Sequence, residues 1–180
     1  MQNSNQQITV QLHAQCDEVA QKILQICVDN NLKIAAAESL TSGLLADSFV
    51  RIAGASQVFL GSAVTYDIRA KHSILHVSQI LLDENGAVHP EVAQQMAEHT
   101  AQLYNQTEYD NRIIGLATTG VAGPGADGDK PAGLVYVAVS LPACIQKSSI
   151  VKKLQLQGDR EQIRMQTVYE LLQILYVALS

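Results

Sequence analysis

Residues 35–49 have the sequence AAAESLTSGLLADSF. It passes from small apolar residues through Glu38 and the hydroxyl residues Ser39, Thr41 and Ser42 to a glycine, and then becomes amphipathic. Such a sequence predicts a short buried strand that leads through a turn into a helix. The hydroxyls either cap this helix by accepting hydrogen bonds from its first N–H groups, or include a nucleophile at the positive end of the helix dipole.

Helices and strands alternate on both sides of this stretch. Apolar residues recur at spacings of three or four in the segments expected to be helical, whereas the expected strands are short and rich in apolar or β-branched residues. In the first half of the chain the predicted helices are residues 11–28, 41–54, 68–77 and 89–105, and the predicted strands are residues 33–38 and 59–67.

The second half of the chain reads as three strands followed by one long helix. The predicted strands are residues 112–119, 132–140 and 148–157, and the predicted helix is 159–179 with Asp159 as its cap. Helices alternate with strands in the first half of the chain, and a helix ends it. We therefore expect an α/β fold, a three-layer α/β/α sandwich with a mixed sheet. The length of 180 residues predicts a single domain, 1–180.

Composition limits the class of protein. Hydrophobic residues make up 47% of the chain and charged residues 16%, as is typical of a compact enzyme or binding domain. The net charge of -5 argues against a general nucleic-acid surface, since phosphate contacts need clustered Lys and Arg. The nearest approach to a basic cluster is Lys152, Lys153, Arg160 and Arg164. We therefore expect no nucleic-acid partner.

The cysteines and the chain ends bear on location. Cys16, Cys27 and Cys144 form no CxxC pair and are odd in number, which favours a reducing compartment, and we expect all three to be buried. Residues 1–10 lack the basic and apolar regions of a signal peptide. The apolar residues 171–179 fall far short of the ~20 that span a bilayer. We expect a cytoplasmic protein without a membrane partner.

A glycine-rich stretch, GPGADG at residues 123–128, matches the GxGxxG pattern of dinucleotide sites. That pattern must open a helix, whereas here Pro131 leads into another strand. A P-loop is excluded as well, because Asp129 separates the glycines from Lys130 and Pro131 replaces the Ser or Thr that binds magnesium. What remains is a glycine-rich loop at the carboxyl end of a strand, either a ligand site or an ordinary wide turn.

Two histidines, His72 and His76, lie four residues apart on a predicted helix, a spacing at which two imidazoles can share a metal. The sequence offers them no third ligand, and the HExxH motif is absent. We therefore interpret them as ordinary solvent-facing or core histidines and predict no metal.

Two cations stand where a reaction could use them. Lys71 follows Tyr66, which closes a predicted strand, and is a base only if it points back to the strand ends, where burial lowers its pKa from ~10.4. Arg160 opens the last predicted helix, where its planar donors and the free N–H groups suit a phosphate. The alternatives are a solvated lysine and a surface ion pair of Arg160 with Asp159 or Glu161.

Five motifs taken together resemble one family. In order, they are AESLTSG, VTYDIRAK, GAVHPEVA, TTGVAGPGADGDKPAG and GDREQIR. The C-terminal domain of the competence-damage-inducible CinA proteins is similar, with AESxTGG, VTYxNxxK, GAVSxxVA, TGIAGPxG, a later KPVG, and GDR. The resemblance covers a core of about 12–178 and leaves out the larger N-terminal domain of two-domain relatives.

The resemblance implies a chemistry. Active members of the family are nicotinamide mononucleotide (NMN) amidohydrolases, which release nicotinate mononucleotide and ammonia by a Ser/Lys mechanism with neither metal nor cofactor. Carried over by position, the nucleophile is Ser39 and the general base is Lys71. The N–H groups of Thr41, Ser42 and Gly43 would then stabilise the oxyanion. Capping becomes the second role of these hydroxyls.

The same resemblance implies residues that hold the substrate. The tyrosine of the VTY motif falls on Tyr66, and the arginine that faces the phosphate falls on Arg160. Thr119 and Gly120 occupy the TG of the glycine-rich loop, which the family places against the substrate. Self-association in the family and the apolar last helix together predict at least a homodimer.

The chain departs from the family pattern at five positions: Leu40, Ser42, Ile68, His89 and Pro90. Ser42 adds a side chain beside the expected oxyanion hole, and Ile68 replaces a polar asparagine. The serine and lysine are retained, so we expect activity on NMN. A substrate-drifted or non-catalytic nucleotide-binding or regulatory domain is the alternative that these departures leave open.

Overall fold

The protein is built on one mixed sheet of five strands. The computed structural model describes residues 2–146 and 148–180. Its strands, in the spatial order β2-β1-β3-β4-β5, are β1 (Lys33–Glu38), β2 (Phe59–Val64), β3 (Ile113–Gly120), β4 (Leu134–Leu141) and β5 (Ser148–Gln155). β1 pairs in parallel with β2 and β3, whereas β4 runs antiparallel to β3 and β5.

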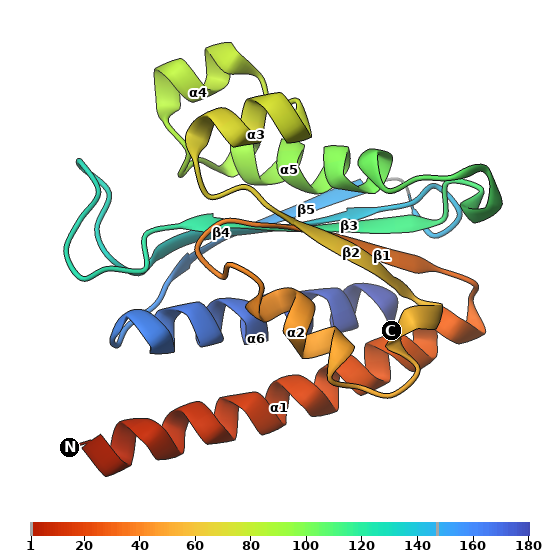
Figure 1. Cartoon of the computed structure of the whole chain (residues 1–180), viewed down its shortest axis with the longest axis horizontal. Helices are drawn as coiled ribbons and strands as arrows, with labels where there is room; N and C mark the ends of the chain where they lie inside the picture. Colours follow the sequence, from red (N-terminus) through yellow and green to blue (C-terminus); the bar gives the residue numbers. More distant parts are fainter. Residues whose placement is uncertain (1, 147) are drawn as a thin grey trace.

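Helices cover both faces of this sheet. They are α1 (Gln2–Asp29), α2 (Leu44–Val50), α3 (Ile68–Leu75), α4 (Gln79–Asn85), α5 (Pro90–Leu103) and α6 (Arg160–Leu179), with short 3-10 turns η1 (Ala55–Gln57) and η2 (Thr107–Tyr109). Figure 1 shows α1, α2 and α6 on one face and α3, α4 and α5 on the other. The predicted three-layer α/β/α sandwich with a mixed sheet is confirmed.

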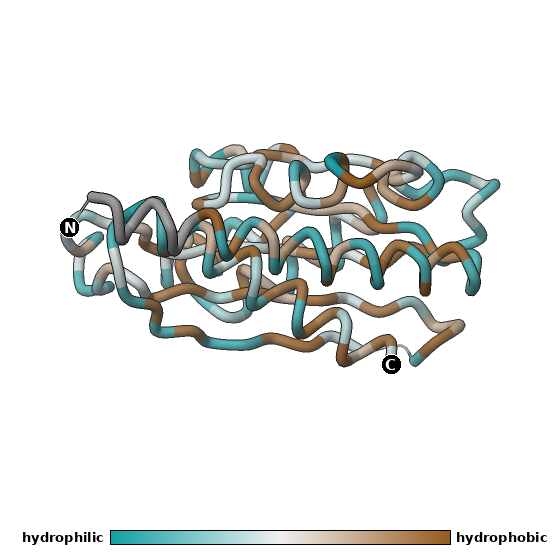
Figure 2. The backbone as a smooth tube through the Cα atoms, turned by 90° about the horizontal axis from the view of Figure 1, so that it is seen from below, coloured by the Kyte–Doolittle hydropathy of each residue, from teal (hydrophilic) through white to brown (hydrophobic). Residues whose placement is uncertain are grey.

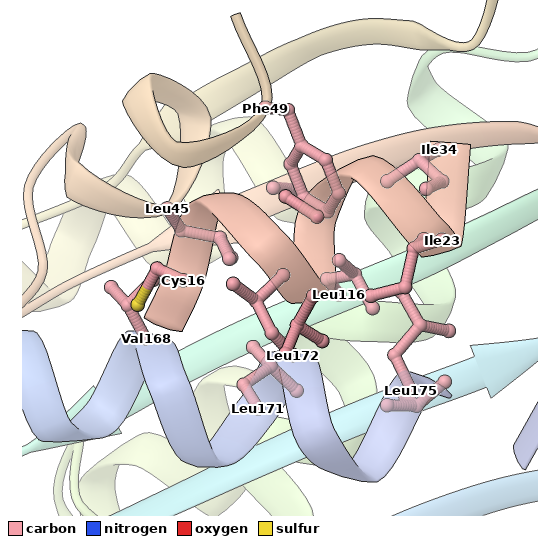
Figure 3. Packing of buried hydrophobic residues seen from close by; sticks show 14 of the residues in the cluster. Cys16, Ile23, Ile34, Leu45, Phe49, Leu116, Val168, Leu171, Leu172 and Leu175 are labelled. Atoms are coloured by element: carbon pink, nitrogen blue, oxygen red, sulfur yellow. The ribbon is translucent and has the colours of Figure 1, made fainter. Parts of the chain in front are cut away.

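Both central strands are buried because helices cover them on both sides. β1 is nearly continuous in small apolar residues and β3 is buried along all but its last residue, as strands covered on both faces must be. The larger core lies between the sheet and α1, α2 and α6, where Ile23, Phe49, Leu116 and Leu172 pack together (Figure 3). On the other face α5 packs closely on β3. The approach is so close that a Cβ on Gly115 would collide with the carbonyl oxygen of Ala97 in α5.

The long first helix shows how burial selects one face. Seen from below, α1 crosses the molecule with hydrophobic and hydrophilic residues alternating along it (Figure 2). Its buried residues include Cys16, Ile23 and Cys27, which recur at helical spacing. Within the described chain, no helix combines the length and the apolar character that crossing a membrane requires.

The second helix starts later than the sequence predicts. The expected helix 41–54 begins only at Leu44, because Ser42 and Gly43 have positive φ angles of 49° and 98°. Residues in this left-handed conformation turn the chain and do not continue a right-handed helix. The hydroxyl residues Ser39, Thr41 and Ser42 therefore lie in the turn between β1 and α2.

Other boundaries also differ from the prediction. α4 was not predicted at all, and the chain reaches it because His76, with a φ of 55°, ends α3 at Leu75. β2 ends at Val64, so Tyr66 lies two residues beyond the strand that it was expected to close. α1 begins nine residues earlier than expected, at Gln2 rather than Gln11.

The expectation that all three cysteines are buried is wrong for one of them. Cys16 and Cys27 are buried in α1, whereas Cys144 is exposed in the turn after β4. A turn lies over the surface and offers no apolar environment for the thiol.

The parallel strands bring three loops to one edge of the sheet. Glu38 at the end of β1 pairs with Val64 of β2 on one side and with Thr118 of β3 on the other. The chain leaves all three strands at this edge, so the loops that follow them lie together, which is where α/β sheets bind their ligands. In Figure 1 the loop between β3 and β4 projects at the same end as the start of α6.

Candidate active site

The turn after β1 is organised around a buried carboxylate. Glu38 is fully buried, and its oxygens accept hydrogen bonds from two hydroxyls and from three N–H groups at the start of α2. The donors are Thr41 Oγ1 (2.7 Å), Ser62 Oγ (2.8 Å), Gly43 N (2.9 Å), Ala46 N (3.0 Å) and Leu45 N (3.1 Å). A buried negative charge at the positive end of a helix is stabilised by these donors and by the helix dipole.

Lys71 reaches back into this edge of the sheet and contacts Ser39. Lys71 is fully buried, and its Nζ donates to Ser39 Oγ at 3.0 Å and to the carbonyl oxygen of Thr65 at 2.5 Å. Ser39 is 8% exposed, so of these two residues it is the one that solvent reaches. The structure thus brings together the two residues that the family pattern assigns to nucleophile and base.

Burial gives this lysine an unusual acidity. Removal from water disfavours the charged ammonium and lowers the pKa of Lys71 from 10.5 to about 8, while the negative charge of Asp67 acts in the opposite direction. Asp67 caps α3 by accepting a hydrogen bond from Arg69 N at 2.8 Å, which fixes the start of the helix that carries Lys71. Near pH 8 a large fraction of Lys71 is therefore neutral and able to accept a proton.

The free N–H groups of the turn are fewer than the sequence predicts. Gly43 N is bonded to Glu38, and Leu44 N donates to the carbonyl oxygen of Thr41 at 3.1 Å. In the described part of the chain, the N–H groups of Thr41 and Ser42 have no acceptor. Of the three groups expected to bind an oxyanion, two are available and the third, that of Gly43, serves Glu38.

Thr118 supports the turn from β3. Its Oγ1 lies 2.9 Å from Thr41 Oγ1 and 3.4 Å from Ser39 N, and its carbonyl oxygen accepts from Ser39 N at 3.1 Å. Sequence reasoning missed Thr118 and Glu38. The signal for Thr118 was the alternation of a strand, because neighbouring side chains on β3 point to opposite faces and only one of Thr118 and Thr119 can face the turn.

Thr119 and Gly120 contact other parts of the fold. Thr119 Oγ1 donates to the carbonyl oxygen of Ala87 at 2.7 Å, which ties the loop before α5 to the sheet. A Cβ on Gly120 would lie 2.7 Å from the carbonyl oxygen of Leu134 and from Val135 Cα, so glycine is required by the close approach of β4. The contacts that the structure describes for both residues are thus with the neighbouring loop and strand.

Tyr66 and Arg160 meet beside the glycine-rich loop. Arg160 donates through Nη2 to the hydroxyl of Tyr66 at 3.1 Å and through Nη1 to the carbonyl oxygen of Gly123 at 2.6 Å. Tyr66 is 60% exposed, and Arg160 opens α6, where Asp159 caps the helix in a capping box with Gln162. Glu161, one of the ion-pair partners expected for Arg160, instead binds Arg164 at 2.9 Å.

A hollow of about 400 Å³ lies next to Tyr66. It is lined by Tyr66, Ile68, Gly86, Ala87, Val88, Asp127, Asp129 and Lys130. Ile68 therefore takes part in this wall, whereas His89 and Pro90 begin α5 as its cap and first residue. A larger hollow of about 770 Å³ lies at the opposite end of β3 and β4, near Ile113 and Ser140, and none of the residues above lines it.

The two histidines four residues apart, His72 and His76, lie at the end of α3. His72 Nδ1 lies 2.9 Å from the carbonyl oxygen of Val77, and His76 ends α3 in the left-handed conformation. Within residues 2–146 and 148–180, no group of three or more His, Cys, Asp or Glu is placed to bind a metal ion.

Known proteins share both sequence and fold with this chain. The sequence profile of the CinA C-terminal domain matches residues 16–179. Competence-damage inducible proteins of Caldanaerobacter subterraneus and Thermoanaerobacter sp. are 40% and 43% identical over 149 and 159 residues, or 82% and 88% of the chain. The chain spans only 34% and 35% of the length of these two relatives.

Solved structures agree with the fold. The competence/damage inducible protein CihA from Agrobacterium tumefaciens superposes with a TM-score of 0.82 at 31% identity, covering 91% of this chain and 95% of that one. A CinA superfamily protein from Enterobacter cloacae reaches the same TM-score at 23% identity over 92% of both chains, which shows the shared fold.

The buried amine of Lys71 predicts a stability that depends on pH. Between pH 8 and 10.5 the unfolded chain, in which Lys71 has its ordinary pKa, binds more protons than the folded chain, so the free energy of unfolding rises with pH across this window. Relative to Lys71→Met, the wild type should gain up to roughly 3 kcal/mol between about pH 7 and 10.5.

Urea unfolding at several pH values measures this difference. Lys153→Met, which removes an exposed lysine of β5, is the matched control and should show no such gain. A difference between wild type and Lys71→Met that stays constant with pH would show that Lys71 is not held as a buried, partly neutral amine.

Proposed function

The chain belongs to the CinA C-terminal domain family, and we propose that it is a nicotinamide mononucleotide amidohydrolase that uses a Ser/Lys pair and no metal. The observation that carries this proposal is the 3.0 Å contact between the buried amine of Lys71 and the hydroxyl of Ser39. An amide is a poor electrophile, so a serine that cleaves it needs an adjacent base. The choice of NMN comes from the resemblance of the sequence motifs to the family.

The first half of the reaction forms an acyl-enzyme. Ser39 Oγ attacks the carboxamide carbon while its proton passes to the neutral Nζ of Lys71, and the negative charge that develops on the carbonyl oxygen is taken by free N–H groups of the turn. The positive charge of the pyridinium ring draws electrons from the carboxamide and assists the attack. Lys71 then gives its proton to the nitrogen of the breaking C–N bond, and ammonia leaves.

The second half of the reaction returns the enzyme to its starting state. Water attacks the ester of Ser39, Lys71 takes a proton from this water and gives it to Ser39 Oγ, and nicotinate mononucleotide is released. In this scheme Glu38 and Thr118 touch no reacting atom, and they hold the turn in which Ser39 lies.

The phosphate of NMN has its proposed partner in Arg160. Its guanidinium now donates to the hydroxyl of Tyr66 and to the carbonyl oxygen of Gly123, both neutral acceptors. A phosphate accepts charge-assisted hydrogen bonds, which are about twice as strong as neutral ones, so it is the better partner for the same donors. Thr119 and Gly120 act in this proposal through the loops that they hold in place.

We place this activity in the cytoplasm, where a reducing environment suits the free thiols of Cys16 and Cys27. NMN is the small-molecule partner, and neither a nucleic acid nor a membrane is required. The departure at Ser42 supports one alternative, a domain that binds the nucleotide without cleaving it, because Ser42 adds a side chain where the family pattern has glycine, beside the expected oxyanion hole.

Replacing the Ser/Lys pair tests the proposal directly. Ser39→Ala removes the attacking oxygen and Lys71→Met removes the base while keeping an apolar stem, so each should lower ammonia release from NMN by roughly 10³-fold or more. Because the two residues act as one unit, the double variant should be scarcely worse than either single variant. The wild-type rate should rise with pH through the lowered pKa of Lys71, about 8, and should persist in a metal chelator.

An exposed serine of α3 gives the control, since Ser73→Ala should leave the rate unchanged. Near-normal ammonia release by Ser39→Ala, or loss of the wild-type rate in chelator, would contradict the Ser/Lys mechanism. Thermal stabilisation by NMN without ammonia release would instead favour the non-catalytic binding domain.

The phosphate assignment is tested by comparing two substrates. Arg160→Ala should lower kcat/KM for NMN by roughly tenfold or more, because charge-assisted hydrogen bonds of ~1.5–3 kcal/mol each are lost. Nicotinamide riboside, which lacks the phosphate, should be affected little, and Lys153→Ala serves as a control for the loss of one exposed positive charge. Equal losses for the two substrates would show that Arg160 does not bind the phosphate.

We also propose that the protein associates at least into a homodimer. Val177 on α6 is 73% exposed, and Val10 and Val28 on α1, which packs beside α6, are exposed as well. Light scattering at micromolar concentration should give at least twice the 19.5 kDa of one chain. A mass of one chain would rule out the dimer.

A further inference from the structure

Arg164 clamps the turn that carries Ser39, from a helix more than a hundred residues away along the chain. Its Nε donates to the carbonyl oxygen of Leu40 and its Nη2 to that of Thr41, both at 2.9 Å. Its remaining nitrogen, Nη1, donates to Glu161 at 2.9 Å. The planar guanidinium thus binds two successive carbonyls at once.

This contact fixes the direction of two N–H groups. A peptide unit is planar and trans, so the N–H of each residue points opposite to the carbonyl of the residue before it. With the carbonyls of Leu40 and Thr41 both directed at Arg164, the N–H groups of Thr41 and Ser42 both point away from it. Like the N–H of Leu40, these two groups have no acceptor among the described residues, but only these two follow carbonyls that Arg164 binds.

An N–H group without a partner is rare in a buried position. Thr41 is fully buried, and more than about nine in ten buried N–H groups in native proteins are paired. The side chain of Thr41 is nevertheless well satisfied, with its hydroxyl 2.7 Å from Glu38 and 2.9 Å from that of Thr118. The turn is therefore held on both sides, and the N–H of Thr41 is a donor that the described protein leaves without an acceptor.

We propose that Arg164 is a positioning residue that holds the N–H groups of Thr41 and Ser42 as the oxyanion hole for Ser39. This inference rests on the proposed amidohydrolase function. In this proposal Arg164 itself touches no substrate, and each of its three side-chain nitrogens donates within the protein, to Leu40, Thr41 or Glu161. Without it the carbonyl oxygen of Leu40 loses its donor and that of Thr41 keeps only Leu44 N, so the N–H groups that follow them are held less firmly in a common direction.

The expected effect is on the chemical step. Oxyanion donors act on charge that develops only in the transition state, so losing their alignment lowers kcat and leaves substrate binding nearly unchanged. Removing one such donor costs about 10²- to 10³-fold in kcat in serine hydrolases. A purely structural arginine would instead lower stability without this separation of kcat from KM.

The chain contains a matched control for this arginine. Arg112, at the start of β3 and so at the opposite end of the strands, also binds two successive carbonyls, with Nε to Asn31 at 3.1 Å and Nη2 to Asn30 at 2.8 Å. Arg112→Met removes the same kind of contact as Arg164→Met but far from Ser39. Comparing the two separates the loss of a backbone clamp in general from the loss of this one.

The experiment measures kcat and KM for NMN and the melting temperature of each variant. Arg164→Met should lose about 10²-fold in kcat with KM within about threefold of wild type, whereas Arg112→Met should keep its kcat. A kcat of Arg164→Met within about threefold of wild type, or an equal loss in both variants, would overturn the inference. If Arg164→Met does not fold, Arg164→Lys takes its place. A lysine can keep one of the two bonds to the turn, so we expect its kcat to fall about tenfold. An unchanged kcat of Arg164→Lys would overturn the inference.

A second measurement separates this inference from the proposed substrate. A fluorophosphonate reacts when Ser39 Oγ bonds to phosphorus and fluoride leaves, and the same N–H groups bind the phosphoryl oxygen, so mass spectrometry reads the oxyanion hole without NMN. If the wild type is labelled but releases no ammonia from NMN, the proposed function fails alone, and slower labelling of Arg164→Met than of Arg112→Met still supports the inference. Equal labelling rates overturn it, and a wild type that is neither labelled at Ser39 nor able to release ammonia from NMN overturns both.

Discussion

The carboxylate of Glu38 is the constraint on which the site depends. It ends β1, the strand between β2 and β3 in the sheet, and it is fully buried, so the protein itself must stabilise its charge. The sequence around it supplies the compensation: three N–H groups at the start of α2, the hydroxyl of Thr41, and Ser62 of β2. One buried charge thereby links two strands, a turn and a helix, and the turn that it shapes carries Ser39.

Lys71 is the second buried ionisable group at this edge of the sheet, and unlike Glu38 it has few partners to stabilise its charge. Glu38 gains five strong donors, whereas Lys71 has only the hydroxyl of Ser39 and the carbonyl oxygen of Thr65 as contacts within the described structure. Burial with such weak compensation lowers the pKa of the amine and costs folding free energy at neutral pH. The same energetic cost is what makes the amine a base, so stability and reactivity are opposed at this residue.

Helix α6 connects the two ends of the proposed substrate. Arg160 and Arg164 lie one helical turn apart and on the same side of the helix, as residues at this spacing do. Arg160 points to the glycine-rich loop and Tyr66, whereas Arg164 points to the turn at Ser39. A shift or rotation of α6 would therefore move the proposed phosphate site and the proposed oxyanion site together, and the packing of Leu171 and Leu172 against α1 and the sheet resists such a shift (Figure 3).

Local sequence patterns located most of the elements and selected the residues to which the proposal assigns chemistry. Apolar periodicity located all five strands and all the helices except α4, because it depends on neighbours two to four residues apart. The order of the motifs selected Ser39, Lys71, Tyr66 and Arg160 for roles in the proposed reaction. Three contacts come from the three-dimensional structure: Glu38 binds the N–H of Gly43, Thr118 rather than Thr119 contacts the turn, and Arg164 clamps it. The contacts of Thr118 and Arg164 join residues 77 to 124 positions apart, whose proximity follows from strand order and helix packing and leaves no trace in a local pattern. The bond from Gly43 N to Glu38 spans only five residues, but it forms in a turn with left-handed φ angles that the expected helix 41–54 did not include.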